Sequence, residues 1–192
     1  MSTLRRFSPF DLLRFHNVNL DPLTETFTLG FYTQYLAKWP HYCFHVDAAH
    51  GRSMGYVLGK AEGRGFAGKA PFPGSVDPGV HPGLPWHGHV TAVTVAPEYR
   101  RLGVAQALMG LVEAVADHDD CWFVDLFVRR SNRVAIDFYE RLGYSICRHI
   151  IAYYSGDDED AYDMRKPLSR DVDRKSAVPL PRPIHPEDLE DD

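Results

Sequence analysis

A short segment before an apolar helix could hold an anion. Arg100, Gly103 and Ala105 follow the apolar run 93–95 and precede leucines and valines that recur at helical spacing over 108–115. Where a strand leads into a helix, the free N–H groups of the first helical turn point outward together with the positive end of the helix dipole. Gly103 and Ala105 are small enough for phosphate oxygens to approach that backbone. The pattern predicts a phosphate-binding loop, and a plain helix start with solvent-facing arginines is the alternative.

Two histidines could form a second site. His87 and His89 are separated by one residue, which places both side chains on one face of a strand. Zinc sites in proteins take three or four ligands, and the neighbouring sequence offers no third one. We therefore expect no metal here.

Alternating strands and helices must position these residues. We expect a first strand over 3–7, a helix that is capped by Ser8 and begins at Pro9, and a second helix that ends at Pro40. The remaining predicted elements are a hairpin (42–48 and 55–60), strands 89–95, 121–128 and 145–154, helices 103–117 and 132–142, and a last strand near 162–165. The helix 132–142 is expected to be capped by Ser131 or Asn132 and ended by Gly143. Such alternation with short connections is typical of an α/β fold.

Composition limits the class of protein. The chain has 192 residues, 44% of them hydrophobic, which suits one core, and its formal net charge of −5 with scattered basic residues argues against nucleic-acid binding. The three cysteines, Cys43, Cys121 and Cys147, sit in apolar runs without metal-ligand spacing, so we expect a reducing compartment. No signal sequence or membrane span is recognised, and a soluble, cytoplasmic protein is expected.

Two segments stand apart from this pattern. Residues 63–85 are rich in Gly and Pro and lack an apolar period, which predicts a surface loop or insertion. Residues 167–192 are polar and carry five prolines, so we expect a tail without a core of its own. The domain is therefore expected to span 1–166.

The segment Val-Ala-Pro-Glu-Tyr-Arg-Arg-Leu-Gly-Val-Ala, between a strand and an amphipathic helix, resembles the coenzyme A pyrophosphate loop of the GNAT acetyltransferases. This resemblance implies a mixed sheet of about seven strands flanked by about four helices, with acetyl-CoA as the acyl donor. Asn132 and Tyr139 resemble the second GNAT signature, on a later helix. The cofactor residues implied are Val93, Thr94, Val95, Arg100, Arg101, Leu102, Gly103, Val104, Ala105, Asn132 and Tyr139.

Tyr139 is the expected general acid. Attack of an amine on a thioester expels a thiolate whose conjugate acid has a pKa of about 8.5, and a nearby O–H group can protonate it. Ordinary core packing with Phe138 and Leu142 is the alternative for this side chain. Tyr144 is expected to belong to the core.

Four further segments resemble a narrower family, the catalytic subunits of NatB, which acetylate protein N-termini. They cover 15–27, 86–93, 123–129 and 161–166. The resemblance implies substrates beginning Met-Asp, Met-Glu, Met-Asn or Met-Gln. The peptide-site residues implied are Glu25, Phe27, His89, Thr91, Ala92, Phe127, Tyr153 and Tyr154. His89 would hydrogen-bond the second side chain of the substrate, since an imidazole can donate to a carboxylate or an amide.

The proton acceptor is left open by the sequence. An α-ammonium has a pKa of about 8, so a strong base is unnecessary. His89, or a water molecule ordered by Glu25, could take the proton. Two features depart from the NatB pattern: the longer loop after Arg64, and Phe27 where a tyrosine is expected.

The resemblance also implies partners. A large helical-repeat auxiliary subunit would dock on the first helices and the proline-rich tail and would bring the enzyme to nascent chains at the ribosome. Acetylation of a lysine or a small amine by the same machinery, or a catalytically silent acyl-CoA-binding subunit, are the alternatives.

Overall fold

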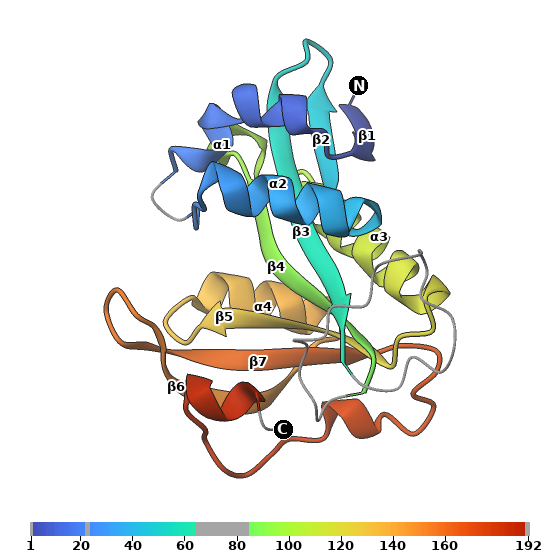
Figure 1. Ribbon diagram of the computed structural model, residues 1–192, viewed down its shortest axis with the longest axis vertical. Helices are drawn as coiled ribbons and strands as arrows, with labels where there is room; N and C mark the ends of the chain where they lie inside the picture. The colour runs from blue at the N-terminus through green and yellow to red at the C-terminus, as the bar shows by residue number, and fades with distance from the viewer. Residues whose placement is uncertain (1, 22–23, 64–84, 191–192) are drawn as a thin grey trace. The chain divides into compact units, whose positions relative to one another are not determined.

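The computed structural model describes residues 2–21, 24–63 and 85–190 (Figure 1). These residues form one seven-stranded mixed sheet and four α-helices. The elements are β1 (Ser2–Arg6), α1 (His16–Asn19), α2 (Leu29–Lys38), β2 (Phe44–Ala48), β3 (Ser53–Glu62), β4 (His87–Val95), α3 (Val104–His118), β5 (Phe123–Arg129), α4 (Arg133–Arg141), β6 (Ser145–Tyr154) and β7 (Glu159–Pro167). The strand order is β1-β2-β3-β4-β5-β7-β6. Nearly all of the predicted Gly/Pro-rich loop lies outside the described residues.

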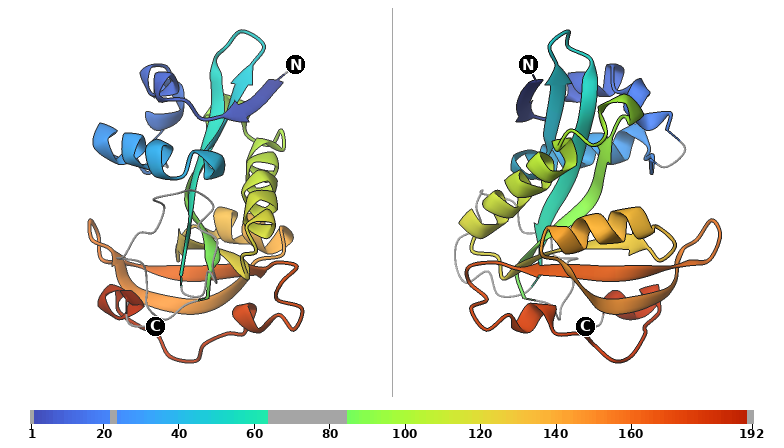
Figure 2. Two further views of the ribbon diagram at one scale, coloured as in Figure 1. Left: turned by 45° about the vertical axis from the view of Figure 1, so that its right-hand side comes forward. Right: turned by 180° about the vertical axis from the view of Figure 1, so that it is seen from behind.

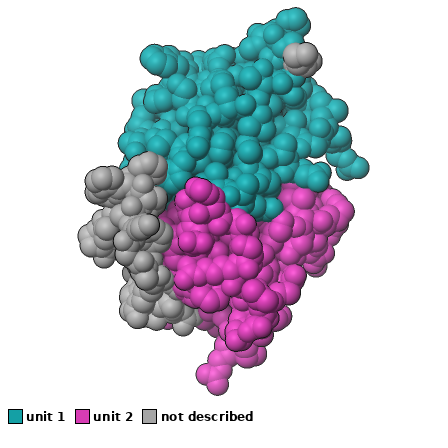
Figure 3. Space-filling model, turned by 90° about the vertical axis from the view of Figure 1, so that its right-hand side faces the viewer, with its two compact units in different colours: residues 1–60, 90–115 teal, residues 61–89, 116–192 magenta. Residues whose placement is uncertain are grey.

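Contacts divide the chain into two compact units, coloured separately in Figure 3. Unit 1 comprises residues 1–60 and 90–115, and unit 2 comprises 61–89 and 116–192. Strand β4 therefore contributes its first three residues to unit 2 and the remainder to unit 1.

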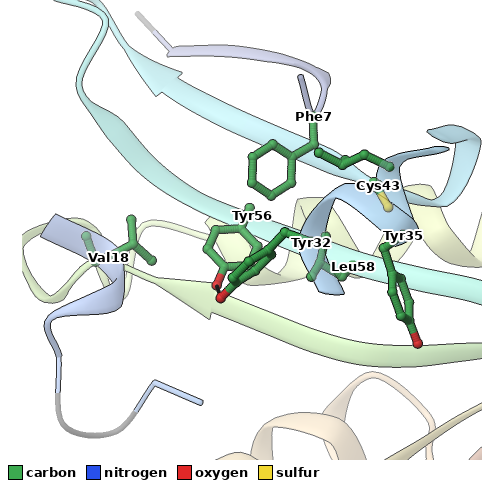
Figure 4. Close-up of a cluster of buried hydrophobic side chains, with 9 residues drawn as sticks. Phe7, Val18, Tyr32, Tyr35, Cys43, Tyr56 and Leu58 are labelled. Atoms are coloured by element: carbon green, nitrogen blue, oxygen red, sulfur yellow. Dashed lines mark hydrogen bonds between the residues drawn. The ribbon is translucent and has the colours of Figure 1, made fainter. Parts of the chain in front are cut away.

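Unit 1 is built around an antiparallel hairpin and an aromatic core. Strand β2 pairs with β1 on one side and with β3 on the other, both antiparallel, as the predicted hairpin requires. Helices α1 and α2 bury aromatic and aliphatic side chains against these strands (Figure 4). The fully or nearly buried members of this cluster are Phe7, Val18, Tyr32, Tyr35, Leu36, Cys43, Tyr56, Leu58 and Ala96.

The expected first helix is replaced by two shorter pieces. Residues Pro9–Leu13 form a 3-10 helix with a capping box, in which the Ser8 side chain accepts from Phe10 N–H and Asp11 accepts from Ser8 N–H. The buried Asp11 carboxylate also binds the guanidinium groups of Arg5 and Arg14. The chain leaves helical geometry at Arg14, and α1 begins anew at His16. The capping prediction was therefore correct, whereas the single continuous helix was wrong.

Unit 2 contains a three-stranded antiparallel arrangement. Strand β7 lies between β5 and β6 and pairs with both. Strand β6 has the bounds that the sequence predicts, and β7 is longer than predicted because it begins at Glu159, within the acidic turn. A register shift between Ile150 and Tyr154 accompanies a positive φ of 51° at Ala152.

Helix α4 ends in a Schellman motif that fixes its last turn. Tyr144 N–H donates to the Tyr139 carbonyl (3.0 Å) and Gly143 N–H donates to the Glu140 carbonyl (3.0 Å). Gly143 has φ 94°, a conformation that glycine adopts without steric cost. The Tyr144 ring is buried and packs edge-on against Tyr139, so the predicted core role of Tyr144 is confirmed.

The C-terminal segment (168–190) follows the outer strand β6 (Figure 2). Ile184 N–H donates to the His149 carbonyl (3.1 Å), and its carbonyl accepts from Ile151 N–H (2.8 Å). Leu180 N–H donates to another β6 carbonyl (2.7 Å). Most side chains of the segment are exposed, and its start is also held by hydrogen bonds to Asp117, Asp120 and Trp122.

The structure also bears on the expected burial of the cysteines and on the expectation that no segment spans a membrane. The three cysteines are all buried, as predicted. Among the described residues, no helix combines the length and the apolar character that crossing a membrane requires.

Candidate functional site

The predicted phosphate loop forms the start of α3 in unit 1. After β4, residues Pro97–Tyr99 make a 3-10 turn, and Arg101 and Gly103 then adopt positive φ angles of 65° and 78°. Gly103 stands immediately before the helix, and its carbonyl accepts the first helical hydrogen bond, from Ala107 N–H. A Cβ on Gly103 would meet no atom within 4 Å. The space beside the Gly103 backbone is therefore free of protein atoms, which is compatible with the predicted phosphate loop.

The arginines of this loop differ in their surroundings. The Arg100 guanidinium pairs with the Asp21 carboxylate, and its Nε donates to the Val95 carbonyl (3.2 Å). Arg101 and Leu102 are exposed, Leu102 by 65%. Arg100 therefore ties the loop to Asp21, whereas Arg101 is an exposed cation beside the start of α3.

The other predicted residues of unit 1 lie on β4 and on the segment before α2. Val93, Val95 and Ala105 are half-buried, and Val104 is buried. Thr94 Oγ1 hydrogen-bonds Thr24 Oγ1 (2.7 Å), which ties this segment to β4.

The predicted peptide residues of unit 1 have contrasting environments. Thr91 Oγ1 hydrogen-bonds the Tyr35 hydroxyl (2.8 Å), and Ala92 packs on the aromatic core. Phe27 stacks on Phe31 with ring centroids 4.4 Å apart, so one of its faces is already covered. Glu25 is exposed.

Tyr139 and Asn132 belong to α4 in unit 2. Tyr139 is 9% exposed, and its hydroxyl has no hydrogen-bond partner among the described residues. Burial raises the pKa of Tyr139, which keeps the hydroxyl protonated at neutral pH. The Asn132 side chain caps the helix by accepting from Ala135 N–H (3.1 Å), as the sequence suggested for this position.

His89 forms a buried pair with an aspartate that sequence reasoning missed. His89 Nδ1 and Asp125 Oδ1 are 2.8 Å apart, and the two residues are 8% and 3% exposed. Burial alone would raise the pKa of Asp125, but the imidazoles of His87 and His89 outweigh it and hold that pKa well below its usual range. Asp125 is therefore a carboxylate, and the neutral or charged imidazole of His89 must donate from Nδ1. A single acid inside the apolar run 123–128 was the signal available in the sequence.

His87 belongs to the same buried cluster but has different partners. Its Nδ1 donates to the Pro85 carbonyl (2.7 Å), and its Nε2 lies 3.6 Å from Asp125 and 3.8 Å from Glu62. Burial lowers the pKa of His87, against the opposing effect of the two carboxylates. Within the described ranges, no group of three or more His, Cys, Asp or Glu side chains is arranged to hold a metal ion.

Four predicted peptide residues form a continuous row of ring contacts in unit 2. The His89 ring meets Phe127 edge-on at 5.2 Å, Phe127 meets Tyr153 at 5.0 Å, and Tyr153 meets Tyr154 at 5.1 Å. Phe127, Tyr153 and Tyr154 are half-buried, and His89 is buried. The row runs from a buried polar end at His89 to the hairpin between β6 and β7.

Arg129 anchors the hairpin end of this row and was also missed. Its guanidinium lies 4.0 Å from the Tyr154 ring centroid and pairs with Asp157 (2.9 Å) and Glu159 (2.8 Å). Glu159 in turn accepts from Ser131 N–H (2.9 Å), immediately before the α4 cap. Position 129 could not be distinguished in the sequence from an ordinary solvated arginine at a strand end.

Comparison with known proteins identifies the class to which this fold and these residues belong. The family described as "Acetyltransferase (GNAT) family" matches residues 12–144. The chain is therefore a member of the GNAT acetyltransferase family.

More specific similarities extend over the whole chain. It is 55% identical over 194 residues to the N-terminal acetyltransferase B complex catalytic subunit of Arabidopsis thaliana, with 100% of both chains covered. It also resembles the crystal structure of Chaetomium thermophilum Naa20 in complex with a bisubstrate analogue (TM-score 0.82, 45% identity, covering 96% of this chain and 97% of that one). A structure of the NatB acetyltransferase complex bound to CoA and MES aligns with a TM-score of 0.72 at 37% identity, covering 86% and 99%. Within the GNAT family, the chain belongs to the catalytic subunits of NatB.

Proposed function

We propose that this enzyme transfers the acetyl group of acetyl-CoA to the α-amino group of protein chains beginning Met-Asp, Met-Glu, Met-Asn or Met-Gln. The observation that carries the proposal is the row from His89 to Tyr154, in which a polar imidazole lies at one end of an aromatic surface. An aromatic surface suits the methionine side chain, and an imidazole suits the carboxylate or amide that follows. The name of the Arabidopsis thaliana relative, an N-terminal acetyltransferase, supports the α-amino group as the acceptor.

The donor would bind at the start of α3. The open backbone around Gly103, preceded by Arg101, fits a pyrophosphate, which helix N-termini favour. Backbone groups of Val93 and Val95 would accompany the pantetheine arm. The catalytic domain would comprise residues 1–166, with 167–192 as its tail.

Acetyl-CoA supplies the acetyl group as a thioester. Side chains of the enzyme would donate and accept the protons of the reaction. As the substrate nitrogen forms its bond to the acetyl carbon, the carbon–sulfur bond breaks and the sulfur needs a proton. Tyr139 would supply it, because its hydroxyl is protonated and carries no other hydrogen bond among the described residues. The proton of the α-ammonium would pass to His89 or to a water molecule near Glu25.

The enzyme would work in the cytoplasm with a helical-repeat auxiliary subunit that docks it near the ribosome. Large apolar side chains on the first helical segments support such docking, since Phe10, Leu13 and Leu20 are 79%, 82% and 80% exposed. Contiguous exposed apolar residues mark protein interaction surfaces.

The test is a peptide panel. The purified chain, alone and with its auxiliary subunit, is incubated with acetyl-CoA and peptides beginning Met-Asp, Met-Glu, Met-Asn, Met-Leu and Ser-Glu, and thiol release is followed. We expect preference for the first three. Equal activity on all peptides would replace the substrate assignment with a lysine or small-amine acceptor, and tight coenzyme binding without turnover would indicate a silent subunit.

A further inference from the structure

Three polar side chains form a closed hydrogen-bond network in the aromatic core of unit 1. Asn19 Nδ2 donates to the Tyr32 hydroxyl (3.0 Å), and the Tyr56 hydroxyl donates to Asn19 Oδ1 (2.9 Å). The two hydroxyl oxygens lie 3.3 Å apart and point toward one another (Figure 4). Both tyrosines are buried, and Asn19 is half-buried. The network joins α1, α2 and β3 through their side chains.

The direction of these hydrogen bonds follows from the single hydrogen of each hydroxyl. Tyr56 gives its hydrogen to Asn19 Oδ1, so Tyr32 must donate in the bond between the two tyrosines. The Tyr32 oxygen accepts from Asn19 and also from Phe27 N–H (3.3 Å). Its hydrogen and both of its lone pairs are therefore in use. Tyr32 is the member of the network that contacts the backbone before α2.

Phe27 depends on this contact because its own side chain has no polar group. Its ring stacks on Phe31 at 4.4 Å and meets the Tyr32 ring edge-on at 5.8 Å. Ring contacts of this kind allow sliding, whereas a hydrogen bond to the backbone fixes a position along the chain. Tyr32 thus holds Phe27 both by its ring and by its hydroxyl.

A second attachment lies three residues earlier in the chain. Thr24 Oγ1 hydrogen-bonds Thr94 Oγ1 of β4 (2.7 Å). The exposed Glu25 follows directly, and the Tyr32 contact to Phe27 comes two residues later. Two predicted peptide residues, Glu25 and Phe27, are therefore carried on a short stretch that is fixed at both ends. Fixing such a stretch before the substrate arrives removes an entropic cost from binding.

We propose that Tyr32 is a positioning residue for the acceptor peptide, whose hydroxyl is oriented by Asn19 and Tyr56 and holds Phe27 in place for the substrate. The inference rests on the proposed function and on the predicted place of Phe27 in the peptide site. None of the hydrogen bonds of the network involves the loop before α3. Loss of the Tyr32 hydroxyl should therefore weaken the use of peptide and leave the use of acetyl-CoA unchanged.

The experiment is the substitution Tyr32→Phe, which removes one oxygen atom and keeps the aromatic ring in the core. The enzyme, with its auxiliary subunit, is assayed by thiol release at varied concentrations of a Met-Asp peptide and of acetyl-CoA. We expect the KM for the peptide to rise about fivefold, the equivalent of one net hydrogen bond. The kcat and the Kd for coenzyme A should change by less than about twofold.

Two further variants separate positioning from a general loss of stability. Tyr56→Phe removes another hydroxyl of the network but keeps the bond between Tyr32 and Phe27. It should lower stability toward urea about as much as Tyr32→Phe, yet raise the peptide KM by less than about twofold. Tyr162→Phe removes a hydroxyl from a half-buried tyrosine of unit 2 whose ring contacts His149, and it should keep the parental constants.

The outcomes also distinguish the inference from the function on which it rests. An unchanged peptide KM in Tyr32→Phe, or a rise that follows the loss of stability equally in Tyr32→Phe and Tyr56→Phe, would leave Tyr32 a core residue and overturn the inference. Absence of any preference for Met-Asp over Met-Leu in the parent enzyme would overturn the proposed function, and the constants for the Met-Asp peptide would still decide the role of Tyr32.

Hydrogen exchange in the parent enzyme gives a measurement that needs no variant, should Tyr32→Phe fail to fold. The amide hydrogen of Phe27, bonded to a buried hydroxyl, should exchange at least about tenfold more slowly than in an unstructured chain. Exchange at the unstructured rate would show that Tyr32 does not hold this backbone and would overturn the inference.

Discussion

Helices α3 and α4 both carry predicted site residues, but they begin differently. Helix α3 starts from Gly103, which has no side chain with which to cap the first turn, and a Cβ there would meet nothing within 4 Å. Helix α4 starts from Asn132, whose side chain caps Ala135 N–H, and Glu159 accepts the nearby N–H of Ser131.

The difference reflects what each helix would contribute. An anion site needs free backbone N–H groups, so α3 must leave its own start unsatisfied. Helix α4 would contribute the Tyr139 hydroxyl from its interior, and its start can therefore be closed by the protein. One helix would act through its backbone and the other through a side chain. Four substitutions and one matched control, taken from the largest expected effect to the smallest, test this contrast.

Tyr139→Phe removes the hydroxyl of α4 and nothing else. We expect turnover to fall on the order of 10²-fold or more, because the leaving thiolate loses its proton donor, while coenzyme A still binds. Steady-state thiol release and calorimetric binding measure the two quantities. Unchanged turnover would remove Tyr139 from the mechanism and leave it a core residue.

Gly103→Ala alters the start of α3. The residue has φ 78°, where a Cβ costs roughly 1 to 2 kcal/mol, and the added methyl group lies where phosphate oxygens would approach. We expect coenzyme A to bind about tenfold more weakly, as measured by titration calorimetry.

Gly110→Ala is the matched control for that substitution. Gly110 lies in the interior of the same helix, and a Cβ there meets no atom within 4 Å. Alanine should stabilise the protein by about 1 kcal/mol through helix propensity and leave coenzyme affinity unchanged. Equal losses of affinity in both variants would show that any added methyl group on α3 weakens coenzyme binding. The start of α3 would then have no special role as an anion site.

Asn132→Ala opens the start of α4. Loss of an N-cap side chain lowers the free energy of unfolding by about 1 kcal/mol, measured by urea denaturation. If Asn132 acts only as a cap, coenzyme affinity should not change. A large loss of affinity without a loss of stability would instead assign Asn132 to the cofactor and make the two helix starts more alike.

Glu159→Gln removes the carboxylate that accepts from Ser131 N–H, immediately before the Asn132 cap of α4. Hydrogen bonds from Ser131 and then from Arg129 lower the pKa of Glu159 from 4.5 to about 2. A carboxyl whose pKa is lowered on folding stabilises the native state above about pH 4.5 and loses that effect as pH falls toward 2. The Ser131 amide should exchange hydrogen faster in the variant at pH 6, and the difference should shrink below pH 4.5. A difference that is independent of pH would contradict the assignment.

Much of this architecture could be predicted because its signals are local. The strand 145–154, the Ser8 cap and the Gly143 helix end all follow from turn chemistry and apolar periodicity. The long first helix was wrong because the buried Asp11 gathers Arg5 and Arg14 around one carboxylate, a tertiary arrangement that helical periodicity does not encode.

The polar partners in the site were harder to predict. Asp125 meets His89 across 36 residues of sequence, and Arg129 meets Tyr154 across the hairpin. No motif in the sequence marks either partner. Each contact forms only when the strands that carry the residues come together in the fold. The sequence resemblance predicted which residues would face a substrate, whereas their partners Asp125 and Arg129 became evident only in the structure.

The C-terminal segment has a consequence for the behaviour of shortened chains. Strand β6 is the last strand of the sheet, and Leu180 and Ile184 occupy hydrogen-bonding groups along it. A chain cut after Pro167 would present an open strand edge, and unprotected edges pair with one another. Self-association at high concentration is then the expected defect, so these exposed and proline-rich residues would keep neighbouring copies of the enzyme apart.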